Sequence, residues 1–233
     1  MANPSTSFFG QTGDAIVDAA TRGYFWSLTF DRTIDWCIAD GFNGEFWTNP
    51  ASVVEHVGAA LDSISSFTNV RFQYVGYWAT PTDAWVSGSE VTVTIGQIGF
   101  PFANSGTWGR AYFPSAVDSV SPYFGAAGDV YLNMDSAANN LPSYEPGSSG
   151  WFLLIHELGH ALGRKHPHDD GGTGRPTLSD IGLGSLDFDW FTIMSYADTY
   201  DFNLFAYDPA TPMAMDVLAL QYLYGKNYVD QRG

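Results

Sequence analysis

The chain has 233 residues, of which 45% are hydrophobic and 16% aromatic, so it has enough apolar side chain for a folded core and is not an intrinsically disordered chain. Its 25 acidic and 9 basic residues give a formal net charge of -16, which excludes the basic surface needed to bind nucleic acid or an anionic membrane. A single cysteine excludes an intrachain disulfide framework, and no apolar run reaches the roughly 18 residues that span a bilayer.

The first part of the chain predicts a strand followed by a long helix. Thr33 to Ile38 has the composition of a strand, and we expect Cys37 within it to be a small buried hydrophobic residue. Asn49 and Pro50 mark a helix start, with asparagine as N-cap and proline at the first helical position. Apolar residues then recur at helical spacing as far as Phe67, which predicts a helix packed on a sheet.

Four more strands are predicted from the alternation of apolar and polar residues or from short apolar runs. They cover Val70 to Val75, Glu90 to Ile95, Gly109 to Pro114 and Gly128 to Asn133. Proline at the end of the third of these is typical of an edge strand, because proline has no amide proton for a neighbouring strand. Strands combined with long helices predict an α+β fold.

A histidine motif in the middle of the chain predicts a metal site. If Trp151 to Leu162 is a helix, His156 and His160 lie four residues apart on one face, and both imidazoles can reach one metal ion. Gly163 comes where the helix has to stop, since glycine adopts the left-handed conformation that ends helices. That turn carries His166 back to the metal, and three imidazoles with one open position are typical of catalytic zinc.

The residues around these histidines include a candidate catalytic base, a second candidate for the third metal ligand and two cations. Glu157 directly follows the first histidine and is the candidate general base. His168 competes with His166 as the third ligand, although its spacing fits the motif less well. We expect the charged groups of Arg164 and Lys165 to lie away from the metal, toward solvent or the acidic loop that follows, because cations beside a dication cost Coulomb energy.

The last part of the chain predicts a loop-rich segment and a closing helix. Ser148 or Ser149 is expected to cap the histidine helix, and a last helix runs from Thr211-Pro212 to Gly225. Between them, residues from His166 to about 191 are rich in loops. Calcium binding there is possible, but no calcium-loop spacing indicates it, and we expect a solvated acidic loop. Its acidic residues are Asp169, Asp170, Asp180, Asp187 and Asp189.

These motifs resemble a known clan of zinc endopeptidases. The motif from Ile155 to His166, followed by Thr192 to Tyr196, resembles the metzincins, in which a methionine turn lies beneath the metal. Within that clan, His166-Pro167 and Met194-Ser195-Tyr196 resemble the serralysin family. The segment from Pro212 to Gly225 is similar to the helix that closes serralysin and matrixin catalytic domains.

The resemblance implies a fold more detailed than the residue pattern alone. It implies an α+β metzincin-type catalytic domain with two lobes, a twisted mixed five-stranded sheet, two long helices, and a loop-rich C-terminal lobe with a closing helix. Residues 1–233 would form this single domain. The upper lobe would cover about 24–165, and the lower lobe about 166–233 together with an N-terminal helix at about 14–22.

The resemblance also implies a reaction. The protein would be a zinc endopeptidase that hydrolyses peptide bonds of extended protein substrates through a zinc-activated water, with one catalytic zinc and Glu157 as general base. Tyr196 would act as a movable zinc ligand that stabilises the transition state, and Met194 would form a packing floor under the metal. The edge strand would bind substrate as an added strand through Ala111, Tyr112 and Phe113.

Partners and location follow from the same resemblance. We expect a monomer that acts on proteins or peptides and that is secreted, although no N-terminal signal peptide is visible. The calcium-binding repeats that follow the catalytic domain in serralysins are not found in this sequence, so the chain is either a catalytic domain cut from a longer protein or a departure from that architecture. Two alternatives stay open: a catalytically silent zinc-fold binding module and a matrixin-like protease.

Overall fold

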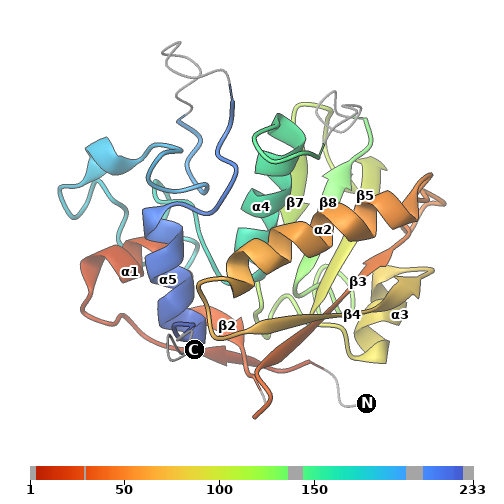
Figure 1. The fold of residues 1–233 in the computed structure, drawn as a ribbon, viewed down its shortest axis with the longest axis horizontal. Helices are drawn as coiled ribbons and strands as arrows, with labels where there is room; N and C mark the ends of the chain where they lie inside the picture. Colours follow the sequence, from red (N-terminus) through yellow and green to blue (C-terminus); the bar gives the residue numbers. More distant parts are fainter. Residues whose placement is uncertain (1–3, 29, 136–143, 198–206, 228–233) are drawn as a thin grey trace, which may run out of the picture.

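A mixed sheet forms the centre of the computed structural model, which describes residues 4–28, 30–135, 144–197 and 207–227 (Figure 1). Its main strands follow the order β4-β3-β5-β8-β7; the first four are parallel, and β7 is antiparallel at the edge. A short strand, β6, pairs with β5 beside this path. The bounds are β3 Thr33–Ala39, β4 Arg71–Trp78, β5 Val91–Ile98, β6 Pro101–Phe102, β7 Gly109–Ala111 and β8 Asp129–Asn133.

The central strands are buried on both faces, as expected for parallel strands. The first six residues of β5 and all five residues of β8 are buried. β7 is shorter than the predicted strand and ends at Ala111. The edge position predicted for this strand is confirmed, because β7 is the last strand in the sheet order and pairs only with β8 among the described residues.

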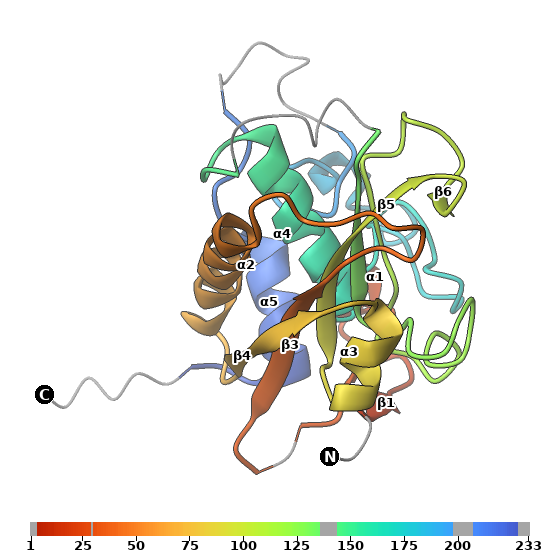
Figure 2. The same cartoon turned by 90° about the vertical axis from the view of Figure 1, so that its right-hand side faces the viewer.

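Two long helices cover one side of the sheet, as Figure 2 shows. α2 (Pro50–Ser65) begins where predicted, and the Asn49 side chain accepts a hydrogen bond of 3.4 Å from the Ser52 amide. α4 (Ser149–Ala161) carries the histidine motif and is buried around almost its whole circumference. The core between sheet and helices includes Ile34, Ile38, Leu61, Ile64, Val93, Leu132, Leu154, Ile155 and Leu158.

Some elements were not predicted. α3 (Pro81–Ser87) begins with a local signal, since the Thr80 hydroxyl accepts from the Asp83 amide at 3.2 Å and proline follows at the first helical position. The helix is too short for apolar periodicity to reveal it. β1 (Thr6–Phe8) and β2 (Tyr24–Trp26) pair antiparallel as a separate two-stranded sheet.

The N-terminal helix lies beside the last helix. α1 (Ala15–Ala20) and α5 (Ala214–Tyr224) share a small buried cluster, and a short 3-10 helix, η1 (Gly184–Leu186), lies in the loop between α4 and α5. The cluster consists of Ala19, Ala20, Leu178, Met215 and Ala219. The predicted α+β class is confirmed, whereas the division into two lobes stays a prediction. Among the described residues, no helix is both long and apolar enough to cross a membrane.

Candidate metal centre

α4 is fixed at both ends by the residues that the sequence suggested. Of the two predicted caps, Ser148 is the N-cap, and its hydroxyl accepts a hydrogen bond of 3.2 Å from the Trp151 amide. At the other end, Gly163 has a φ of 99°, which favours glycine. A β-carbon at this position would also lie 2.2 Å from the Tyr24 carbonyl oxygen. The turn at Gly163 therefore requires glycine on two grounds.

Beyond this turn, His166 meets the two helical histidines. Its Nε2 atom lies 3.3 Å from His156 Nε2 and 2.9 Å from His160 Nε2. Ligand nitrogens about 2.0–2.1 Å from a tetrahedral zinc ion are separated by about 3.3–3.4 Å, so the observed spacing is close to that of a zinc site. The three histidines form one of two groups of possible metal-binding side chains among the described residues.

The other ring nitrogen of each histidine has an acceptor. His156 Nδ1 lies 2.6 Å from the Ile193 carbonyl, and His160 Nδ1 lies 2.9 Å from the Arg164 carbonyl. His166 Nδ1 lies 2.8 Å from a carboxylate oxygen of Asp169. Because carbonyls and carboxylates only accept, each Nδ1 carries the proton and each Nε2 presents its lone pair. Three lone pairs that converge in this way fit a cation.

Burial keeps the helical histidines neutral. Desolvation lowers the pKa of His156 to about 3 and also lowers the pKa of His160, and the neighbouring imidazoles add to both effects. Neutral imidazole is the form that binds zinc.

Burial of Glu157 raises its pKa to about 8, and Arg110 opposes this shift. A dication bound nearby would also oppose it, because it favours the ionised carboxylate.

The methionine turn lies directly under α4. Met194 is fully buried, and a β-carbon on Gly159 would lie 2.7 Å from its sulfur atom. Asp216 of α5 accepts from the Ile193 amide at 2.9 Å and from the Thr192 hydroxyl at 2.6 Å. α5 therefore holds the turn, whose Ile193 carbonyl in turn faces His156.

The charged groups of the two cations after Gly163 point away from the three histidine Nε2 atoms, but Arg164 takes a direction that we did not expect. Arg164 is 1% exposed and does not face solvent or the acidic loop: it donates 2.6 Å to Asp216, 3.2 Å to the Thr192 hydroxyl and 2.8 Å to the Ala20 carbonyl. Because its partners come from three segments, Arg164 links α1, the methionine turn and α5. Lys165 is also buried, but its ammonium group donates to the Asp169 carbonyl at 2.6 Å, in the predicted direction of the acidic loop.

The acidic segment is only in part the solvated loop that we expected: Asp170 and Asp180 are exposed, whereas Asp169, Asp187 and Asp189 are partly or fully buried. Asp169 orients His166; burial raises the pKa of its carboxyl, but the hydrogen bonds from His166 and the Gly171 amide outweigh burial and leave the pKa below the usual value. Asp187 accepts from the Ser195 hydroxyl at 2.6 Å. Asp189 is only 3% exposed. Asp169 and Asp187 therefore have a structural role, because they accept hydrogen bonds from the metal-site histidine and from the methionine turn.

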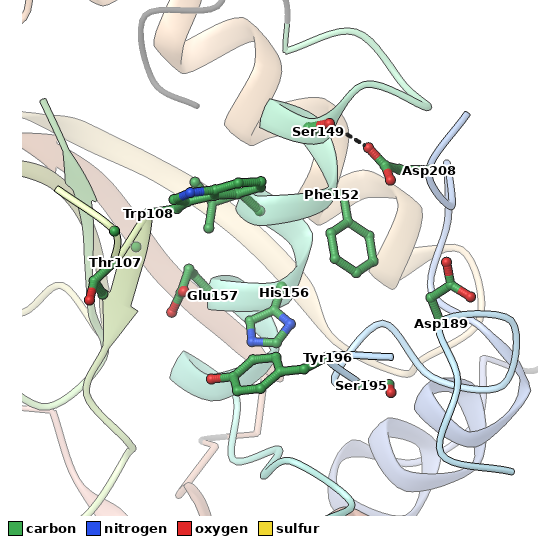
Figure 3. Close-up of a pocket in the computed structure, with 13 residues that line it drawn as sticks. Thr107, Trp108, Ser149, Phe152, His156, Glu157, Asp189, Ser195, Tyr196 and Asp208 are labelled. Carbon is green, nitrogen blue, oxygen red and sulfur yellow. Dashed lines mark hydrogen bonds between the residues drawn. The ribbon is translucent and has the colours of Figure 1, made fainter. Parts of the chain in front are cut away.

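His168 and Tyr196 flank the third histidine. His168 stacks on His166 with ring centres 5.1 Å apart, and its Nδ1 lies 3.4 Å from Asp187. His168 also forms a second group of possible ligands with His166 and Asp169, so it stays a competitor. The centre of the Tyr196 ring lies 4.4 Å from that of His166 and 5.9 Å from that of His156, on which it stacks. Figure 3 shows Tyr196 beside His156. Burial raises the pKa of the Tyr196 phenol to about 12, so at neutral pH it is a proton donor.

Two cavities meet beside Glu157, which lines both together with Tyr196. Of the three residues predicted to bind substrate, Ala111 and Phe113 line the second cavity, and Phe113 also packs against His160 with ring centres 5.3 Å apart. Tyr112 is buried in a cluster with Tyr131, so its side chain faces away from both cavities. Tyr112 was placed in this set because of its position in the strand, but alternate residues of a strand point to opposite faces.

The fold and the site together define a class: a metzincin-type metalloprotease catalytic domain, with three histidines on and after one helix above a methionine turn. A serralysin from Proteus mirabilis is 32% identical over 187 residues, 77% of this chain and 35% of that protein. The metallopeptidase AprA of Pseudomonas marginalis is 30% identical over 184 residues, 73% of this chain and 38% of that protein. Serralysin C of Dickeya chrysanthemi is 35% identical over 133 residues, 55% of this chain and 25% of that protein.

The chain belongs to the serralysin family of metalloproteases. It spans a quarter to somewhat over a third of the length of these curated relatives. No family model matches the chain.

Proposed function

We propose that the protein is a zinc-dependent endopeptidase that hydrolyses peptide bonds of extended protein substrates. The observation that carries this proposal is the convergence of three imidazole Nε2 atoms beside the buried carboxyl of Glu157. Relatives named serralysin and metallopeptidase support the same activity. A protein substrate digest tests the proposal: cleavage should stop when a chelator removes the metal, and cleavage that persists would contradict it.

His156, His160 and His166 would hold the zinc ion, each through Nε2. When bound, zinc would supply a Lewis acid that lowers the pKa of a coordinated water and polarises the substrate carbonyl. The Nδ1 partners of the three histidines would keep the rings oriented, because each accepts a hydrogen bond from the ring nitrogen that does not face the metal.

Glu157 would act as the general base. Its carboxyl is 5% exposed and faces both cavities, so a water at their junction is within its reach. The carboxylate would take a proton from the attacking water and return it to the leaving amine. The nearby guanidinium of Arg110 favours the ionised carboxylate that this step requires.

β7 would align the substrate. In its antiparallel pairing with β8, Arg110 lies opposite Tyr131, and the Tyr112 amide donates to the Asp129 carbonyl at 2.9 Å. Backbone groups alternate in direction along a strand, so those of Gly109 and Ala111 face away from β8. An extended peptide would add there by main-chain hydrogen bonds. We include in this proposal the two-lobed division, a monomeric state and an extracellular location.

The intact Glu157 favours this proposal over a silent zinc-fold binding module, because its burial between two metal ligands fits a proton-transfer role. The position of Tyr196 beside His156 and His166 favours serralysin-like over matrixin-like chemistry.

Tyr196→Phe should lower kcat and kcat/KM together with little change in KM. Its phenol, a proton donor at neutral pH, would hydrogen-bond the substrate carbonyl oxygen mainly in the transition state. Loss of one such donor costs about 10²–10³-fold at most, and about tenfold still fits because the metal continues to polarise the carbonyl. Steady-state kinetics measures this effect, with exposed Tyr222→Phe as the control. Full kcat in Tyr196→Phe would limit this tyrosine to packing.

A further inference from the structure

A cavity of about 450 Å³ runs from Glu157 toward the N-terminal end of α4 (Figure 3). His156, Glu157 and Tyr196 line the end at the metal centre. Ser149, in the first turn of α4, and Asp208 line the cavity farther along the helix. The cavity therefore connects the proposed reaction site with a polar region about two helical turns away, and a substrate side chain next to the cleaved bond would enter it.

The walls of this cavity are apolar in the middle and acidic beyond. Trp108, Phe152 and Leu153 supply the apolar surface. Beyond them, Asp208 accepts a hydrogen bond of 2.8 Å from the Ser149 hydroxyl, and Asp189 is 3% exposed. This sequence of surfaces matches a long side chain with an aliphatic stem and a charged end.

The charges that line the two cavities differ. The first cavity has three carboxyl groups, those of Glu157, Asp189 and Asp208, and no lysine or arginine among the described residues that line it. The second cavity, across Glu157, is also lined by three carboxyl groups, those of Glu157, Asp169 and Asp170, but Arg22 and Arg110 line it as well and offset part of this charge. These arginines are two of only nine basic residues in the chain. The first cavity therefore has the larger excess of negative charge and attracts a cationic side chain more strongly than the second.

We propose that the first cavity binds a lysine or arginine side chain of the substrate, so that the enzyme cleaves next to basic residues. This proposal rests on the proposed peptidase function. The stem of the basic side chain would pack on Phe152 and Leu153, and its cation would lie near Asp208 and Asp189. The net charge of -16 would also draw basic substrates to the protein.

The expected preference for a basic over a neutral side chain depends on how well the charge of Asp208 is stabilised before substrate binds. Ser149 and the first turn of α4 stabilise the charge of Asp208 in the absence of substrate. A neutral side chain of equal length would fill the apolar part but would not bring a charge that complements the carboxylates. We expect a preference of roughly three- to tenfold for lysine over norleucine at the position that enters the cavity, and a larger discrimination against glutamate.

The test begins with the zinc-loaded protein and a peptide library whose cleavage sites are mapped by mass spectrometry. Lysine and arginine should be enriched, and glutamate depleted, at one position beside the cleaved bond. Values of kcat/KM are then measured for three peptides that carry lysine, norleucine or glutamate at that position. Asp208→Asn should reduce the lysine-to-norleucine ratio toward one. Asp62→Asn, an exposed site on α2, changes the net charge equally and should leave the ratio unchanged.

Each outcome decides between two claims. A ratio near one in the unmodified protein, or equal effects of Asp208→Asn and Asp62→Asn, would overturn the proposal for the cavity. Cleavage of the norleucine peptide would continue in that case, and the proposed peptidase function would stand. If none of the peptides is cleaved by the zinc-loaded protein, the peptidase function fails and the cavity proposal falls with it.

Discussion

Glu157→Ala should abolish almost all peptide hydrolysis while the protein keeps its zinc and its fold. The carboxyl group would transfer protons and would not hold the metal, so its loss should cost at least the roughly 10²–10⁴-fold that general acid–base catalysis contributes. The three histidines and their Nδ1 partners are unchanged in this variant. Steady-state hydrolysis of a peptide, together with zinc analysis of the same preparation, measures both effects.

Two further variants make this result specific. Glu157→Gln keeps the size of the buried side chain and should be as inactive as Glu157→Ala. Glu55→Ala removes an exposed glutamate of α2 and should leave hydrolysis unchanged. Hydrolysis by Glu157→Gln within tenfold of the unmodified protein would contradict the assignment of this residue as general base.

Arg164→Met should destabilise the zinc-loaded protein strongly, by about 3–5 kcal/mol in the free energy of unfolding. The substitution keeps most of the side-chain volume but removes a buried cation and leaves the carboxylate of Asp216, which is fully buried, without its ion pair. It also removes the hydrogen bond to the Ala20 carbonyl, so the contact between α1 and the end of α4 is weakened. Urea unfolding measures the change.

The control for this effect is Arg71→Met, which removes an exposed arginine at the start of β4 and should change stability by less than about 0.5 kcal/mol. In the double variant Arg164→Met with Asp216→Asn, the loss should be smaller than the sum of the single losses, because the two side chains interact directly. Equal effects of Arg164→Met and Arg71→Met would show that the ion pair has no stabilising role.

The sequence predicted local features of the site well, because they depend on residues close together in the chain. The spacing of His156 and His160, the helix end at Gly163 and the return of His166 all follow from helix geometry and glycine conformation. The starts of the strands at 33, 91 and 129 were also predicted within one residue, since their apolar patterns are strong.

Long-range contacts could not be predicted in the same way. The sequence around Arg164 is typical of an exposed cation. Only the fold brings α1, the methionine turn and α5 around it. Asp189 was expected in a solvated loop, yet tertiary packing buries it. A charged residue in a sequence gives no sign of a partner 20 or more positions away. Asp216 likewise meets the methionine turn only through the fold, where it accepts a hydrogen bond from the Ile193 amide.

The sequence analysis missed several residues at the site, and only some of them could have been identified from the sequence. Asp169 stands three positions after His166, and a carboxylate so close in sequence to a ligand histidine indicates an acceptor for its second ring nitrogen. Trp108 and Phe152 gave no sign, because aromatic residues are common in cores and only the fold brings these two to one cavity.

Zinc content tests the central claim most directly. The purified protein should hold about one zinc per chain, and a chelator that removes it should stop peptide hydrolysis until zinc is returned. His166→Ala should lose the metal, whereas His168→Ala should keep it, since His166 Nε2 is the atom that meets the other two histidines. Far-UV circular dichroism confirms that each variant is folded. Full zinc in His166→Ala with loss of zinc in His168→Ala would contradict the proposed site.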